Sequence, residues 1–137
     1  MFKRIFFWGL TAGIFSAVAS VIYQQIHEYA TYSEFHKVVN LPVLIAINIM
    51  ACLLAAFVFW AVMHFSKGRG EFIFNLLFSM ASFASVMFPI TTTLPLDVES
   101  PEMFTSLVIP MHFFPAIAWF TFRPLFAKNG FQPTHTN

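Results

Sequence analysis

Long runs of apolar residues dominate the chain, and short polar segments separate them. Four such runs cover residues 5–23, 41–65, 72–90 and 101–126, with boundaries good to a few residues. A helix needs about 20 apolar residues to cross the hydrocarbon core of a bilayer. Each run is close to that length or above it. The pattern therefore predicts an all-α fold, an integral membrane four-helix bundle in which residues 1–137 form a single membrane domain.

Polar and proline residues mark the starts of two of these helices. Asn40 is a candidate N-cap, and Pro42 lies in the first turn, where its missing N–H does no harm. Ser100 and Pro101 are placed in the same way before the last run, and Glu102 suits the positive end of the helix dipole. At 1.5 Å per residue the last helix would be roughly 39 Å long, so we expect it to tilt, kink or protrude.

The connections between the runs are less clearly predicted. Residues 27–40 either continue the first helix beyond the membrane or lie along its surface. The tail 127–137 is polar and contains Gly and Pro, so we expect it to be flexible.

The basic residues predict the orientation in the membrane. Of the seven Lys and Arg residues, six fall on one side of a four-span bundle: Lys3, Arg4, Lys67, Arg69, Arg123 and Lys128. The other side has Lys37 together with the acidic residues Glu28, Glu34, Asp97, Glu99 and Glu102. Lys and Arg concentrate in cytoplasmic loops. We therefore expect both termini to be cytoplasmic.

The first run has a second interpretation. The basic start, the apolar run and "AVA" at residues 17–19 are also typical of a cleaved signal peptide. However, Gly9, Gly13 and Ala17 recur at every fourth position, and such a row lets membrane helices approach closely. We therefore predict that this row is a helix-packing surface.

The composition narrows the class of protein. Apolar residues make up 58% of the chain and charged residues 9%, whereas soluble domains have about 25% charged residues. A net charge of +1 argues against a nucleic-acid-binding surface. The single cysteine, Cys52, excludes an internal disulfide and a paired-cysteine site.

Several polar side chains interrupt the apolar runs. We expect the hydroxyls of Thr11, Ser16 and Ser20 to bond to carbonyls one turn back. Asn48 is expected to join two helices by a hydrogen bond. Ser79 and Ser82 share one face of the third run with Asn75, and we expect this face to point into the bundle.

His112 is the sharpest candidate for a functional residue. It lies eleven residues after Pro101, about 16 Å along the helix and hence near the middle of the membrane. Pro115 has no N–H to donate to the carbonyl of Met111, so a polar group is left beside His112. The predicted polar pocket consists of His112, Asn48, Ser79 and Ser82. A purely structural histidine that ties helices together is the alternative, and both remain open.

No metal, cofactor or catalytic site is predicted. His27 and His36, with Glu28 and Glu34, suggest a zinc site, but their spacing matches no compact ligand set. A bis-histidine haem needs two deep histidines, and only His112 is deep.

The segments "LPLDVESPEMF" and "PMHFFPA", with the four-span pattern, resemble a bacterial family of small four-helix integral membrane proteins that is defined only as a domain of unknown function. The resemblance covers nearly the whole chain and is most specific in about its last forty residues. It implies a place in the bacterial cytoplasmic membrane. It implies no activity, cofactor or catalytic residue.

Three functions are compatible with these features. The lack of catalytic motifs and the rows of small residues favour a non-enzymatic accessory or scaffold component of a membrane assembly. Its partners would be the lipid bilayer and a second copy or another membrane protein. An alternative is a small-solute or ion transporter or channel that uses a His112/Asn48 pocket. A second alternative is an intramembrane enzyme with His112 as acid or base.

Overall fold

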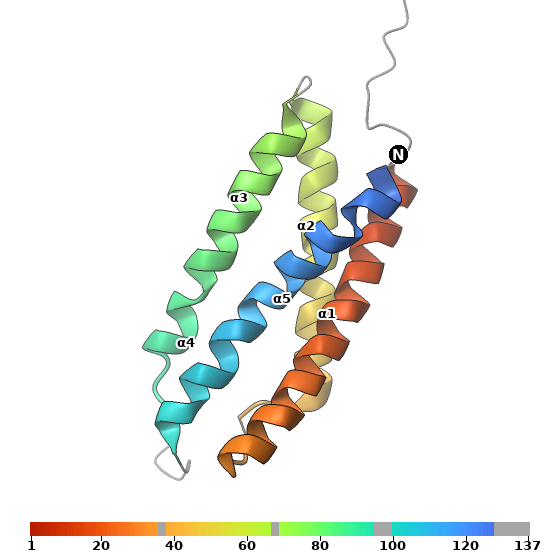
Figure 1. The fold of residues 1–137 in the computed structure, drawn as a ribbon. Coiled ribbons are helices and arrows are strands. Elements are labelled where there is room, and N and C mark those ends of the chain that lie inside the picture. The colour runs from red at the N-terminus through yellow and green to blue at the C-terminus, as the bar shows by residue number, and fades with distance from the viewer. Residues whose placement is uncertain (36–37, 67–68, 95–99, 128–137) are drawn as a thin grey trace, which may run out of the picture.

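The computed structural model describes residues 1–35, 38–66, 69–94 and 100–127. They form α1 (Phe2–Thr31), α2 (Leu41–Phe65), α3 (Gly70–Ser85), the short α4 (Met87–Thr91) and α5 (Pro101–Ala127), with no strand in the described ranges (Figure 1). The predicted all-α four-helix architecture is confirmed, because α3 and α4 together make up the third of the four long helical segments.

Four helical segments are long and apolar enough to cross a membrane: Phe2–Thr31, Leu41–Phe65, Gly70–Thr91 and Pro101–Phe126. They differ in how far the bundle buries them. Within an apolar stretch of 18 residues in each segment, 44% of the residues are buried in the first segment and 33% in the last, but only 11% in the third. The α3–α4 segment therefore lies at the edge of the bundle, and α1 and α5 lie closest to its core.

α1 extends beyond the predicted span 5–23 to Thr31, in agreement with one of the two alternatives for the residues that follow this span. The third segment is interrupted at Val86, between α3 and α4. Pro89 explains this break, because its ring clashes with the carbonyl four residues earlier, that of Ser85, and it cannot donate to it. α4 then begins a new helical turn.

The expected capping of α2 is only partly correct. Asn40 occupies the N-cap position, and its backbone carbonyl accepts a hydrogen bond from the N–H of Leu44 at 2.8 Å. However, the Asn40 side chain makes no capping hydrogen bond. Before α5, Ser100 has a positive φ of 51°, and its carbonyl accepts from the N–H of Met103 at 2.9 Å.

α1 packs closely against α2 through its small residues. A methyl group on Gly9 would lie 2.6 Å from the Cβ of Ala56 and 2.8 Å from the carbonyl oxygen of Cys52. One on Gly13 would lie 3.0 Å from the Cα of Ile49. Ala17 continues the same face and is buried. The two backbones therefore touch along this row, where no larger side chain has space.

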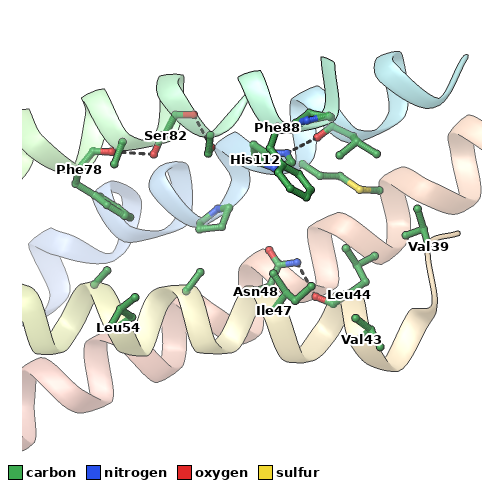
Figure 2. Close-up of a pocket in the computed structure, with 18 of the residues that line it drawn as sticks. Val39, Val43, Leu44, Ile47, Asn48, Leu54, Phe78, Ser82, Phe88 and His112 are labelled. Atoms are coloured by element: carbon green, nitrogen blue, oxygen red, sulfur yellow. Dashed lines mark hydrogen bonds between the residues drawn. The ribbon is translucent and has the colours of Figure 1, made fainter. Parts of the chain in front are cut away.

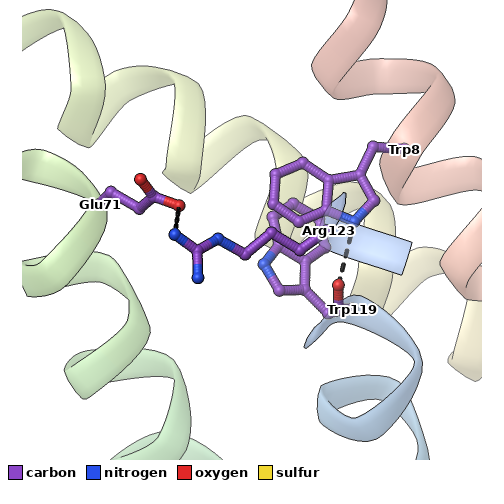
Figure 3. Close-up of polar contacts among 4 residues, drawn as sticks. All are labelled: Trp8, Glu71, Trp119 and Arg123. Atoms are coloured by element: carbon purple, nitrogen blue, oxygen red, sulfur yellow. Dashed lines mark hydrogen bonds and ion pairs between the residues drawn. The ribbon is translucent and has the colours of Figure 1, made fainter. Parts of the chain in front are cut away.

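α1 also packs against α5, through a stacked pair of tryptophans. The indole N–H of Trp8 donates to the carbonyl oxygen of Trp119 at 3.0 Å, and the two rings stack with centroids 4.1 Å apart (Figure 3). Both side chains are fully buried, and Phe59 of α2 and Phe74 of α3 complete this aromatic cluster. The cluster joins all four long segments near one end of the bundle.

Charged residues make contacts at one end of the bundle. At the end where α1 begins and α5 finishes, Arg4 donates to the carbonyl of Phe126. At the same end Arg123 forms an ion pair of 2.5 Å with Glu71 of α3 (Figure 3). Other charged positions used in the orientation argument lie outside the described residues, namely Lys37, Lys67, Asp97, Glu99 and Lys128, as does the tail from residue 128 onward. The cytoplasmic placement of both termini therefore stays a prediction.

Candidate functional site

A cavity of about 860 Å³ lies between α2, the α3–α4 segment and α5 (Figure 2). It arises because α5 runs from beside α4 at its start to beside the start of α1 at its end, leaving α2 and α3 to diverge (Figure 1). Its lining follows α2 from Asn40 to Val58, which is about 27 Å at 1.5 Å per residue. The cavity is therefore elongated along α2.

The lining is almost entirely apolar, and no charged residue belongs to it in the part of the chain that the structure describes. The polar residues among the lining are Asn40, Asn48, Ser82, Ser85, Thr92 and His112. Beyond Asn48, towards the connection between α2 and α3, α2 contributes Ala51, Leu54, Ala55 and Val58, and α3 contributes Phe74, Leu77, Phe78 and Ala81. One half of the cavity is thus mixed, and the other half is wholly apolar.

Asn48 links the cavity to α1. Its Oδ1 accepts hydrogen bonds from the hydroxyls of Ser16 at 2.5 Å and Ser20 at 3.3 Å, and its Nδ2 donates to the carbonyl of Leu44 at 2.9 Å. The second N–H of Asn48 has no partner among the described residues.

The expectation that the hydroxyls of Ser16 and Ser20 bond to carbonyls one turn back is wrong, because both donate to the side-chain oxygen of Asn48. Thr11 does bond back, to Phe7 at 2.8 Å.

His112 lies across the cavity from Asn48 (Figure 2). Its Nδ1 is 2.8 Å from the carbonyl oxygen of Val108, one turn back on α5. A carbonyl only accepts, so Nδ1 carries the hydrogen. In a neutral imidazole, Nε2 is then an acceptor. Nε2 has no hydrogen-bond partner among the described residues, and the half-buried side chain lines the cavity. A free acceptor therefore belongs to the cavity wall.

The two serines of α3 that line the cavity also present acceptors. Ser82 donates its hydroxyl hydrogen to the carbonyl of Phe78 at 2.9 Å, and Ser85 donates to the carbonyl of Ser82 at 2.7 Å. Each oxygen keeps capacity to accept. Ser79 is half-buried but does not line the cavity. The structure thus brings His112, Asn48 and Ser82 together and leaves Ser79 out.

A second polar cluster lies between α1 and α5. His27 Nε2 is 2.8 Å from the hydroxyl oxygen of Ser106, and the hydroxyl of Tyr23 donates to the Ser106 carbonyl at 3.1 Å. Pro110 explains the second contact, because it has no N–H for the carbonyl four residues earlier and Tyr23 supplies a donor instead. Sequence reasoning missed Ser106, although a proline four residues downstream was the available signal.

Gln24 extends this cluster towards α2. Its side chain is fully buried, and Nε2 donates to Glu28 Oε1 at 2.9 Å and to the carbonyl of Val39 at 3.4 Å. Gln24 Oε1 and His27 Nδ1 are buried without a hydrogen-bond partner in the described ranges. Gln24 was also missed, though it lies four residues after Ser20 on the buried face of α1. The cluster fixes the end of α1 rather than shaping the cavity.

Metal binding finds no support in the described part of the chain, where no three His, Cys, Asp or Glu side chains come together. The zinc site considered from the sequence includes His36, which lies outside the described residues.

No known protein family, curated protein or solved structure matches this chain. The resemblance to a bacterial membrane family therefore stays a prediction.

Proposed function

We propose that this chain is a small non-enzymatic integral membrane protein that takes a chain-shaped apolar molecule from the bilayer into its cavity and serves as an accessory component of a membrane assembly. The observation that carries the proposal is the cavity, which is elongated and has no charged residue in its lining among the described residues. The basic residues at one end of the bundle support cytoplasmic termini. The resemblance noted in the sequence supports a bacterial cytoplasmic membrane.

The dimensions of the cavity favour an extended chain over a partner helix. The cavity extends over about 27 Å along α2, and its volume of about 860 Å³ lies within the range of roughly 300–1,000 Å³ typical of small-molecule sites. A single hydrocarbon chain is much thinner than a helix. We therefore infer that the occupant is an unbranched or lightly branched hydrocarbon chain.

The transporter and enzyme alternatives have weaker support. A hydrophilic solute or ion needs polar partners along its path, whereas the described residues that line the half of the cavity beyond Asn48 are all apolar. An acid–base role for His112 needs a reacting group beside it, whereas the hydrogen-bond partner of its ring is the Val108 carbonyl. Neither alternative explains the apolar half of the cavity.

Binding of a plain alkyl chain tests this proposal. The full chain in detergent micelles is titrated with 1-methoxyhexadecane, and the bound fraction is measured by native mass spectrometry. Ala81→Phe fills the apolar half of the cavity and is expected to weaken binding by roughly tenfold, a loss of about 1.4 kcal/mol.

Ala84→Phe is the matched control, because Ala84 lies on the same helix, is exposed and does not line the cavity. It is expected to leave binding unchanged. No measurable binding to the unmodified chain, or equal weakening by both variants, would contradict the proposal.

A further inference from the structure

The polar side chains at the centre of the cavity wall offer more free hydrogen-bond acceptors than free donors. His112 Nε2 and the oxygens of Ser82 and Ser85 accept, while the hydrogens of all three side chains are used by backbone carbonyls. Asn48 supplies the one N–H of this central group that has no partner among the described residues. A buried acceptor without a donor is costly. The wall is therefore complementary to a ligand that brings a hydrogen-bond donor.

The ligand's polar group is expected to be neutral. No Lys, Arg, Asp or Glu lines the cavity in the described part of the chain. Burying an unpaired charge in an apolar site is far more costly than burying a hydroxyl that finds partners. A neutral hydroxyl can donate to His112 Nε2 and can also accept a hydrogen bond, and Asn48 lies on the wall that faces His112 (Figure 2).

The apolar half of the cavity matches a hydrocarbon tail in length. From Asn48 to Val58 the lining of α2 extends over about 15 Å at 1.5 Å per residue. One leaflet of a bilayer with a hydrocarbon core of about 30 Å has the same thickness. A tail that begins beside Asn48 and His112 would therefore fill this half.

We propose that the cavity binds a neutral amphiphile whose hydroxyl group donates a hydrogen bond to His112 Nε2 and whose hydrocarbon tail lies between α2 and α3. This inference rests on the proposed function and names the ligand class of the same cavity. The hydroxyl has two chemical sources, an aliphatic alcohol or a phenol. Both provide the donor that His112 lacks.

The test compares matched ligands on the full chain in detergent micelles. The ligands are 1-hexadecanol, 4-dodecylphenol and 1-methoxyhexadecane, the last of which has a tail and an oxygen but no donor. We expect 1-hexadecanol to bind about five- to tenfold more tightly than the ether, the range for one hydrogen bond to a buried acceptor. His112→Phe should remove this preference, so that the alcohol and the ether bind about equally. His64→Phe, an exposed position outside the cavity, should leave the preference intact.

A second measurement does not depend on a folded variant. In the protein labelled with ¹⁵N-histidine, the Nε2 resonance of His112 should shift when 1-hexadecanol is added and stay unchanged with the ether. A larger shift and tighter binding with 4-dodecylphenol would assign the hydroxyl to an aromatic head, and the reverse order to an aliphatic one.

Equal binding of alcohol and ether, a preference that survives in His112→Phe, or an unchanged resonance would overturn the assignment of the hydroxyl to His112. In those cases binding of the ether would still uphold the proposed function. Failure of every ligand to bind would overturn the proposed function itself.

Discussion

The side-chain oxygen of Asn48 accepts a hydrogen bond of 2.5 Å from the hydroxyl of Ser16, so a polar group on the cavity wall of α2 is anchored by α1. Ser20 donates to the same oxygen. Because the oxygen faces α1, the orientation of the amide is set: one N–H donates to the carbonyl of Leu44, and the other has no partner among the described residues. The contact therefore couples the packing of α1 and α2 to the chemistry of the cavity.

Replacing Asn48 with Ala should destabilise the bundle by about 1 kcal/mol, measured as the free energy of unfolding in mixed detergent. The loss stays near the lower end of the range for a buried hydrogen bond, since Ser16 and Ser20 can turn to carbonyls of their own helix. Ser79→Ala is the control, because Ser79 is half-buried and outside the cavity. An equal loss in both variants would show that the Asn48 contact does not contribute.

Larger side chains in the row of small residues Gly9, Gly13 and Ala17 should separate α1 from α2. Gly9→Ala places a methyl group 2.6 Å from the Cβ of Ala56, well inside van der Waals contact. We expect a loss of about 1–3 kcal/mol in the free energy of unfolding, the usual cost of overpacking. Gly13→Ile should cost more, because its first carbon already meets the backbone of Ile49 at 3.0 Å.

Ala46→Ile is the control for the substitutions at Gly9 and Gly13. Ala46 is exposed on α2, so a larger side chain there would contact lipid or detergent. Its effect should stay within about 0.5 kcal/mol, as for most surface substitutions. Similar losses at Gly9 and Ala46 would rule out close packing of α1 against α2.

The predicted orientation can be measured by cysteine labelling in intact cells. Cys52 is buried, and so an added cysteine dominates the labelling. With cytoplasmic termini, Glu34→Cys should react with an impermeant maleimide, whereas Arg69→Cys should react only after the membrane is permeabilised. Both positions are exposed in the structure. The opposite pattern would invert the proposed topology.

The four helical segments could be predicted because apolar runs of this length are hard to reconcile with any other fold. The end of α1 was predicted only as one of two alternatives. Gln24, His27 and Glu28 lower the hydropathy beyond Tyr23, and so the run appears to stop there. The helix continues because Gln24 and His27 are buried against residues from other parts of the chain, including Val39 and Ser106.

The cavity itself was only partly predictable. Asn48 and His112 stood out because polar groups are rare at mid-membrane depth. The apolar half has no such signal, because cavity-lining and lipid-facing side chains have the same composition. Leu77 lines the cavity and Phe72 does not, yet both are apolar and exposed. They lie five residues apart and therefore on different faces of α3, and the sequence does not say which of these faces lines the cavity.

The most direct test of the cavity as a ligand site is photolabelling in a lipid bilayer. The full chain in nanodiscs is irradiated with a hexadecanol that carries a diazirine in its tail, and the labelled residues are mapped by peptide mass spectrometry. We predict labelling at Leu77 that saturates and is competed by unlabelled 1-hexadecanol, while labelling at the exposed Phe72 is neither saturated nor competed. Labelling of both residues that rises linearly with probe and resists competition would contradict a cavity that binds an amphiphile.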